Sequence, residues 1–188
     1  MKKNKILVIV IIALVLALAG SVWVNVSHVN ERNRARELLM NHVYGSLSSI
    51  SHGLNGILTN INDPTNYDSY RYTLVQLSNQ LTMAHVLLSQ YQNYYSDVNL
   101  DYGSTARNFD FIAATLTGVT GIEFKVLQGN EISEQEVRYL TALRDGIDYM
   151  RSAMESPNSL GADKNLTTTR LSKLLNEFFN KMQSYGNG

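Results

Sequence analysis

The chain lacks cysteine entirely among its 188 residues. This absence excludes disulfide bonds, thiolate nucleophiles, cysteine-ligated zinc and a lipid-modified cysteine. The folded state must therefore be stabilised by side-chain packing. Exported domains without disulfides are ordinary in bacteria, so the absence of cysteine does not by itself assign a compartment.

Proline is almost as rare, because only Pro64 and Pro157 occur. Proline disfavours the helical conformation for the residue before it. Both prolines follow segments whose apolar spacing predicts a helix, so each marks a predicted helix end.

An excess of charge of either sign is also missing, since 16 basic residues balance 16 acidic ones. Three of the lysines precede the first apolar run, so the remaining chain has 16 − 3 = 13 basic residues against 16 acidic ones, a formal charge of −3. No basic surface is expected to hold nucleic acid, and nucleic acid is excluded as a partner.

Motifs for catalysis are absent as well: the chain contains no P-loop, G-x-S-x-G, S-x-x-K or G-x-G-x-x-G. Its histidines, His28, His42, His52 and His85, include no pair four residues apart, the spacing of a helical zinc site. We expect no enzyme activity and no cofactor. An enzyme of unrecognised type stays open as an alternative, because distant residues can converge in a fold.

The one long apolar run covers residues 6–26 and contains no charged residue. At ~1.5 Å per residue a helix of this length reaches about 31 Å, which matches a hydrocarbon core of ~30 Å. Basic residues precede it, and Trp23 lies near its far end, where a membrane interface favours tryptophan. The run predicts a transmembrane signal anchor that contacts membrane lipid through residues 6–26.

A cleaved secretory signal is the competing interpretation of this run. Ala17, Leu18 and Ala19 form a small-x-small site, and cleavage after Ala19 would release a secreted chain that begins at Gly20. The segment stays apolar beyond that point, through residues 22–26, which favours retention of the anchor.

The orientation follows from the short basic head, residues 1–5. Three arginines between residues 32 and 36 match the three lysines before the run, so the counts of basic residues are tied. A short head is readily retained in the cytoplasm while the rest is translocated. We therefore expect a cytoplasmic amino terminus and a single extracytoplasmic domain, residues 31–185.

Beyond the anchor, apolar residues recur at steps of three and four, which indicates amphipathic helices. Residues 70–98 show this most clearly, with a mean spacing near 3.5 residues, as in left-handed helix bundles. The first helix can continue directly from the anchor. The predicted fold is all-α, a single transmembrane helix followed by an up-down bundle of about four to five helices. The predicted helices are residues 31–62, 67–98, 105–127, 133–155 and 166–185.

The predicted core positions lie on one stripe of each helix. They are Leu39, Val43, Leu47, Ile50, Leu54, Ile57 and Ile61; Tyr70, Leu74, Leu77, Leu81, Ala84, Leu88, Tyr91, Tyr95 and Val98; Phe109, Ile112, Leu116, Val119, Ile122 and Val126; Val137, Leu140, Leu143, Ile147, Met150 and Met154; and Leu171, Leu175, Phe178, Met182 and Tyr185.

Two local patterns refine this interpretation. Ser133 and Glu136 form a capping box, which predicts a well-defined helix start. Residues 118–127 are ambiguous, because threonine and glycine dilute the helix and residues 122–127 alone could form a short strand.

A third pattern, Asp97, Asn99 and Asp101, matches the opening of calcium-binding loops, with oxygen ligands at alternate positions. The match fails at Tyr102, where such loops have glycine, and at Asn108, where they have a bidentate glutamate. The sequence thus predicts either a weak calcium loop at 97–108 or a polar turn over residues 96–104, in which Asp101 or Ser104 caps the next helix.

These observations favour a non-catalytic, membrane-anchored envelope protein whose helical domain binds an envelope protein or associates with itself, as a scaffold, accessory or sensor-like component. Its layout resembles, in outline, the outer helical sensing bundles of bacterial chemoreceptors and histidine kinases, which also have a second span and an output domain. Ligand binding is the alternative, either calcium at the 97–108 loop or a small molecule in the bundle beside Tyr91, Tyr94 and Tyr95.

Overall fold

The computed structural model describes residues 2–94, 102–117, 126, 132–157, 161–163 and 165–186. These residues are helical except for short connections, and no β-strand occurs among them. An isolated β-bridge joins Glu155 to Ala162. The predicted all-α class is therefore confirmed for this part of the chain.

The first helix, α1, runs from Lys2 to Thr59. The predicted apolar anchor and the first amphipathic segment thus belong to one helix. Thr59 is its last residue, where we predicted residue 62, because turn hydrogen bonds take over: the Asn60 amide donates to the Ile57 carbonyl over 3.2 Å, and the Asp63 amide to the Asn60 carbonyl over 3.0 Å. A 3-10 helix, η1 (Pro64–Asn66), follows.

The chain divides into two compact units, which we call the N-terminal unit (Met1–Leu38) and the C-terminal unit (Leu39–Gly188). The N-terminal unit consists of the first part of α1. The C-terminal unit contains residues 39–59 of α1, followed by α2 (Tyr67–Tyr94), α3 (Tyr102–Thr117), α4 (Glu134–Met154) and α5 (Thr168–Gly186).

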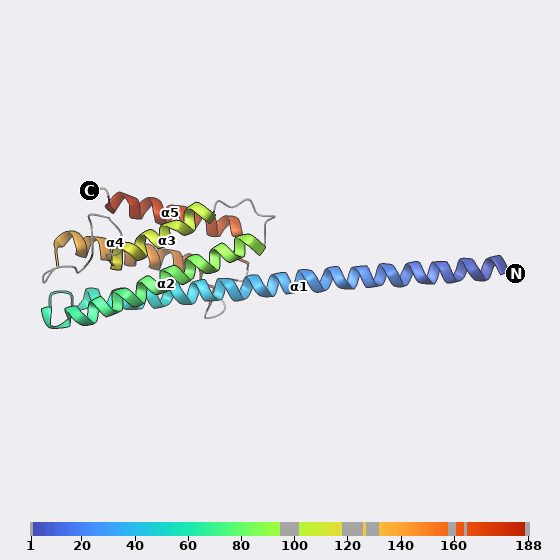
Figure 1. Ribbon diagram of the computed structural model, residues 1–188, viewed down its shortest axis with the longest axis horizontal. Coiled ribbons are helices and arrows are strands. Elements are labelled where there is room, and N and C mark those ends of the chain that lie inside the picture. The colour runs from blue at the N-terminus through green and yellow to red at the C-terminus, as the bar shows by residue number, and fades with distance from the viewer. Residues whose placement is uncertain are drawn as a thin grey trace. The chain divides into compact units, whose positions relative to one another are not determined.

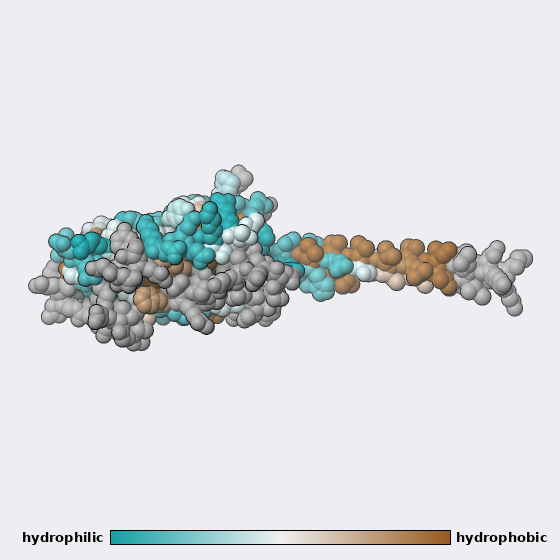
Figure 2. Space-filling view, turned by 90° about the horizontal axis from the view of Figure 1, so that it is seen from above, coloured by the Kyte–Doolittle hydropathy of each residue, from teal (hydrophilic) through white to brown (hydrophobic). Residues whose placement is uncertain are grey.

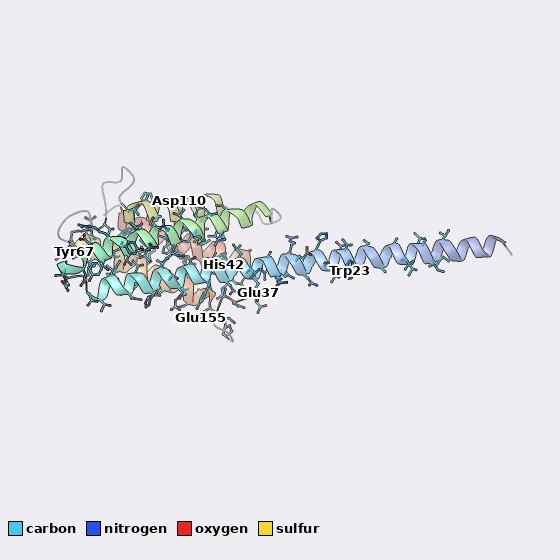
Figure 3. The ribbon with its side chains drawn as sticks, turned by 60° about the horizontal axis from the view of Figure 1, so that its bottom comes forward. Trp23, Glu37, His42, Tyr67, Asp110 and Glu155 are labelled. Atoms are coloured by element: carbon cyan, nitrogen blue, oxygen red, sulfur yellow. The ribbon has the colours of Figure 1, made fainter. Side chains whose placement is uncertain are left out.

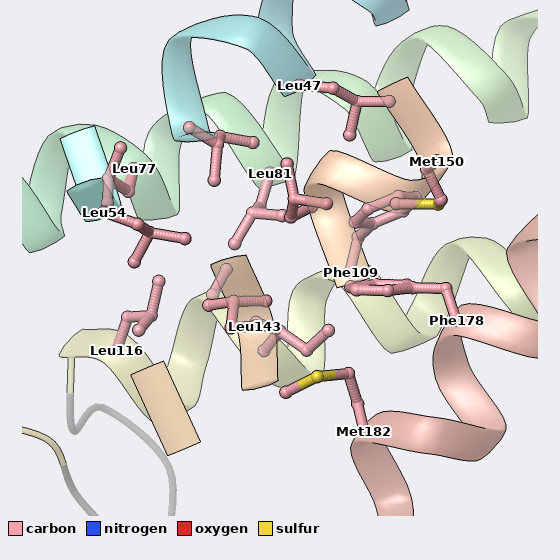
Figure 4. Close-up of a cluster of buried hydrophobic side chains, with 14 of the residues drawn as sticks. Leu47, Leu54, Leu77, Leu81, Phe109, Leu116, Leu143, Met150, Phe178 and Met182 are labelled. Atoms are coloured by element: carbon pink, nitrogen blue, oxygen red, sulfur yellow. The ribbon is translucent and has the colours of Figure 1, made fainter. Parts of the chain in front are cut away.

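The helices of the C-terminal unit lie side by side and share one hydrophobic core (Figures 1 and 4). Each of the helices contributes side chains to it. Residues that face one another in this core are Leu47 and Leu54 from α1, Leu77 and Leu81 from α2, Phe109 and Leu116 from α3, Leu143 and Met150 from α4, and Phe178 and Met182 from α5.

The predicted core stripes are confirmed wherever their side chains are described. All of these positions are buried, except Leu39 and Val137, which are partly buried and pack against the core. The others, Tyr91, Tyr95, Val98, Val119, Ile122 and Tyr185, lie outside the residues whose side chains the structure describes.

The core is wider at α5 than the sequence predicted, because Leu174 and Phe179 are buried as well. The Phe179 ring packs edge-to-face on Phe109, with a centroid distance of 5.0 Å, and lies 5.0 Å from the Phe178 ring. Aromatic pairs in this geometry add about 0.5–1.5 kcal/mol beyond the burial of their area. They join α3 to α5.

The start of α3 corrects the predicted turn over residues 96–104. Tyr102, Gly103 and Ser104 are helical, so Ser104 does not cap this helix. A glycine costs a helix only ~1 kcal/mol, which tertiary packing readily offsets. The question of helix or strand at 118–127 falls outside the described residues, apart from Val126, which lies in a turn and is buried.

The predicted capping box at α4 is confirmed. The Ser133 hydroxyl accepts a hydrogen bond from the Glu136 amide at 3.2 Å, and the Ser133 amide donates to the Glu136 carboxylate at 2.6 Å. The connection after α4 also contributes to the core, because Ala162 and Leu166 are buried. The Asn41 side chain on α1 accepts a hydrogen bond from the Ala162 amide at 3.0 Å.

Two helical glycines test this packing. A Cβ atom at Gly146 would lie 2.7 Å from the buried Phe178 ring, whereas one at Gly45 would meet nothing within 4 Å. Gly146→Ala should destabilise the protein by about 1–3 kcal/mol through overpacking. Gly45→Ala should stabilise it by about 0.5–1 kcal/mol through helix propensity. Thermal or denaturant unfolding monitored by circular dichroism measures both, and equal effects would contradict the described contact between α4 and α5.

Candidate functional site

The most distinctive surface belongs to the N-terminal unit, where large apolar side chains are exposed all around α1. Trp23, labelled in Figure 3, is 73% exposed. Figure 2 shows the aliphatic residues of this stretch as a mostly brown surface along the helix. The exposed apolar residues are Val10, Ile11, Ile12, Leu14, Val15, Leu16, Leu18, Val22, Trp23, Val24, Val26 and Val29.

Among the described residues, α1 is the one helix long and apolar enough to cross a membrane, and none of the 18-residue stretch that meets this criterion is buried. Burying a large apolar side chain is worth about 1.5–3 kcal/mol, so leaving this many in water is strongly unfavourable. The segment has the length and composition of a membrane anchor and also of an amino-terminal signal sequence.

Polar residues begin directly after this surface. The His28 Nδ1 atom lies 3.9 Å from the Glu31 carboxylate, one turn away on α1, and both side chains are exposed. Such a pair is compatible with water but not with a hydrocarbon interior. The apolar surface therefore ends in the same turn in which the first carboxylate of the chain appears.

The predicted calcium ligands Asp97, Asn99 and Asp101 lie outside the described residues. Residues 102–108, which complete the calcium pattern, are helical in α3. Because residues 97–101 are not described, the calcium site stays a prediction. Tyr91, Tyr94 and Tyr95, which would line a small-molecule site, also lie outside the residues with described side chains.

Other metal ligands do not cluster in the part of the chain that the structure describes. No group of three or more histidine, aspartate or glutamate residues there could hold a metal ion. The histidines predicted to be separate are placed separately: His42 and His52 are exposed on α1, and His85 lies on α2.

A polar bridge joins α1 to α4. The buried Ser51 hydroxyl donates to the Asp148 carboxylate at 2.5 Å, and the Arg151 Nε atom lies 3.7 Å from the same carboxylate oxygen. A nucleophilic serine needs a positioned base that can take its proton and pass it on. Here the carboxylate is shared with an arginine and fixes the two helices, so the arrangement is structural.

A second polar contact joins α2 to α3. The His85 Nδ1 atom pairs with the Asp110 carboxylate, and both side chains are partly exposed. Asp110 is labelled in Figure 3. The pair lies at the edge of the core, where it restricts the register between the two helices.

Tyr139 on α4 is the most strongly perturbed titratable group with a defined position. Burial raises its pKa to about 12, and the nearby Thr115 side chain on α3 offsets part of this effect. The tyrosine therefore keeps its proton at neutral pH. Its neighbour Thr115 is itself buried and donates to the Phe111 carbonyl at 2.9 Å, so this polar contact belongs to the core.

The raised pKa of Tyr139 predicts a loss of stability in alkali. An unfolded tyrosine ionises near pH ~10, whereas Tyr139 keeps its proton in the folded state up to about pH 12. Between these pH values the unfolded state therefore binds fewer protons than the folded state. The stability that protonated Tyr139 contributes, on the order of 2 kcal/mol, is lost as the pH rises through this range. Tyr139→Phe should flatten the fall in unfolding free energy between pH 10 and 12. An unchanged slope in this variant would contradict the burial of the hydroxyl.

The polar contacts described above join helices of the C-terminal unit, while the exposed apolar surface of α1 has no such partner among the described residues. The chain matches no known protein family, curated protein or solved structure in comparisons with each.

Proposed function

We propose that residues 6–26 stay uncut in a membrane and hold the C-terminal unit, an up-down helical bundle, on the extracytoplasmic side. Residues 1–5 are the cytoplasmic head. The protein acts without catalysis, as an envelope scaffold or accessory component whose helical unit binds protein partners. The observation that carries this proposal is the fully exposed apolar stretch of α1.

The composition of the core supports the anchor. Every described residue of the core cluster lies at or beyond Met40, and residues 10–26 are all exposed. A soluble protein would bury a long apolar helix in its own core. Because the described core uses none of residues 10–26, lipid is the environment that would remove this run from water.

The arrangement of the polar residues supports a role in binding. Glu136 is used by the helix cap of α4, and Asp148 is used by the bridge from α1. Exposed ion pairs at helical spacing, such as Lys173 with Glu177 on α5, are typical of a solvated helix face. The described part of the chain thus presents helix surfaces for partners.

Trp23 provides a direct test, because it is the only tryptophan in the chain. In the anchored protein its fluorescence should be shifted to shorter wavelengths and should be quenched by lipids with brominated acyl chains, because the indole lies at the membrane interface. The measurement uses the full chain in vesicles. Two outcomes would contradict the anchor and favour the secreted alternative. One is a soluble protein whose Trp23 fluorescence is quenched by the brominated lipids no more than that of free tryptophan, and the other is an amino terminus at Gly20.

A charge test addresses the same segment. Leu14→Arg together with Leu16→Arg adds two charges to the exposed apolar stretch, and each costs about 2.5–3.5 kcal/mol at the centre of an inserted helix. The insertion cost of the two arginines together is comparable with the favourable insertion free energy of the whole apolar run on the same scale. We expect the protein to move from the carbonate-resistant membrane pellet to the soluble fraction.

The matched control places the same charge beyond the span. Leu38 is also exposed on α1 but lies outside residues 6–26. Leu38→Arg should leave the protein in the pellet. Retention of the double variant in the pellet would show that another part of the chain holds the protein there.

A further inference from the structure

Helix α2 has a second face, opposite to the one that fills the core. We call it the outer α2 face, and it repeats at steps of three, one and three residues, so it forms a continuous stripe. It comprises all the exposed residues between Tyr72 and Val86, which are Tyr72, Val75, Gln76, Asn79, Thr82, Met83 and Val86.

This face is unusually apolar for a solvent-facing surface. Tyr72 is 67% exposed, Met83 58%, Val86 47% and Val75 45%. A surface helix normally carries one apolar stripe and a charged or polar face opposite to it. A second apolar stripe therefore indicates a second packing partner.

The outer α2 face also carries no charged side chain. Helices α4 and α5 differ in this respect, because α4 presents Arg138 and Asp145, and α5 presents Lys173 and Lys181. A charged partner would gain nothing from the neutral stripe. A partner of matching chemistry is another neutral helix face.

We infer that the outer α2 face docks on the same face of a second copy of this chain. This inference rests on the proposed anchoring, which confines the copies to one membrane. Charge does not oppose self-association here: two identical faces normally bring like charges together, but this face has none. The C2 contact that results is self-complementary.

Asn79 is the centre of the stripe. The exposed positions are symmetric about it: Tyr72 and Val86 each lie seven residues away, and Val75 and Met83 each lie four residues away. Asn79 therefore faces Asn79 of the second copy whether the two helices run parallel or antiparallel. An amide carries both donors and an acceptor, so two asparagines can pair, as they do in the seams of dimeric coiled coils.

The remaining positions match in either direction. In the antiparallel arrangement Tyr72 meets Val86 of the second copy, and Val75 meets its Met83, so apolar residues oppose apolar ones. Gln76 and Thr82, each three residues from the centre, also meet each other, so polar residues oppose polar ones. In the parallel arrangement each residue meets its own counterpart.

The expected contact is small. Fourteen residue steps from Tyr72 to Val86 span about 21 Å at ~1.5 Å per residue. One helix pair of this length buries less than the ~1,200 Å² at the lower end of specific interfaces. The pair should be weak in dilute solution and should form where anchoring raises the effective concentration. The test therefore uses full-length protein in membranes.

The absence of cysteine makes crosslinking unambiguous. Asn79→Cys introduces the only thiol of the chain, and oxidation or a short bis-maleimide should convert the full-length protein in native membranes into a covalent dimer. The matched control is Asn180→Cys, an exposed asparagine on α5. It should give several-fold less dimer, since it lies away from the docking face.

Paired variants identify the direction of the helices. Tyr72→Cys alone should crosslink in the parallel arrangement. Tyr72→Cys co-expressed with Val86→Cys should give the mixed product in the antiparallel one. Either pattern supports the inference, and crosslinking of Asn79→Cys accompanies both.

A charge placed on the outer α2 face provides the second measurement. Met83→Glu in the Asn79→Cys background should reduce the dimer several-fold, while Ser152→Glu on the exposed side of α4 should not. Both variants should keep the circular dichroism spectrum of the parent, because both sites are exposed. Equal dimer from Asn79→Cys and Asn180→Cys, or a product that contains a different protein, would overturn the inference.

The membrane anchor and the docking of the outer α2 face can be disproved independently of each other. If the chain were recovered in the soluble fraction, the anchor would be disproved, and the same crosslinking would be repeated on protein concentrated to the level that anchoring would give in a membrane. A dimer in that fraction would support the outer α2 face alone, and its absence would overturn the face as well.

Discussion

The removal of apolar surface from water governs this structure, and the chain meets this requirement in two separate parts. From Met40 onward, apolar stripes from five helices meet in one core. Before that residue the same helix, α1, carries apolar side chains that no part of the described structure buries. Because one helix contains both kinds of surface, its two parts need different surroundings. The core supplies one, and we propose that lipid supplies the other.

Much of the helical core could be predicted, because a stripe at steps of three and four depends on local geometry alone. Such a pattern placed Leu81, Leu143 and Phe178 in the core, where all are buried. Helix ends were harder to predict. The capping box at Ser133 was found because its signal lies within four residues, whereas the start of α3 at Tyr102 was left open because the sequence offered both Asp101 and Ser104 as caps.

The long-range polar contacts could not be predicted from the sequence. Ser51 and Asp148 are 97 residues apart, and Asn41 and Ala162 are 121 apart, so no local spacing relates them. The widening of the core by Phe179 has a similar cause: it depends on the position of α3 beside α5. The calcium pattern at Asp97 shows the opposite case, in which a local signal exists and no described contact bears on it.

The two faces of α2 have separable consequences. Leu74 and Leu81 are buried, so they contribute to the free energy of unfolding, whereas Val75 and Met83 are exposed and contribute little to it. Stability measurements on the isolated chain would therefore not detect the outer α2 face. Its apolar residues affect free energy only when a second surface covers them, so association and folding depend on different residues of the same helix. A helix built in this way can change its partner without changing the fold that presents it.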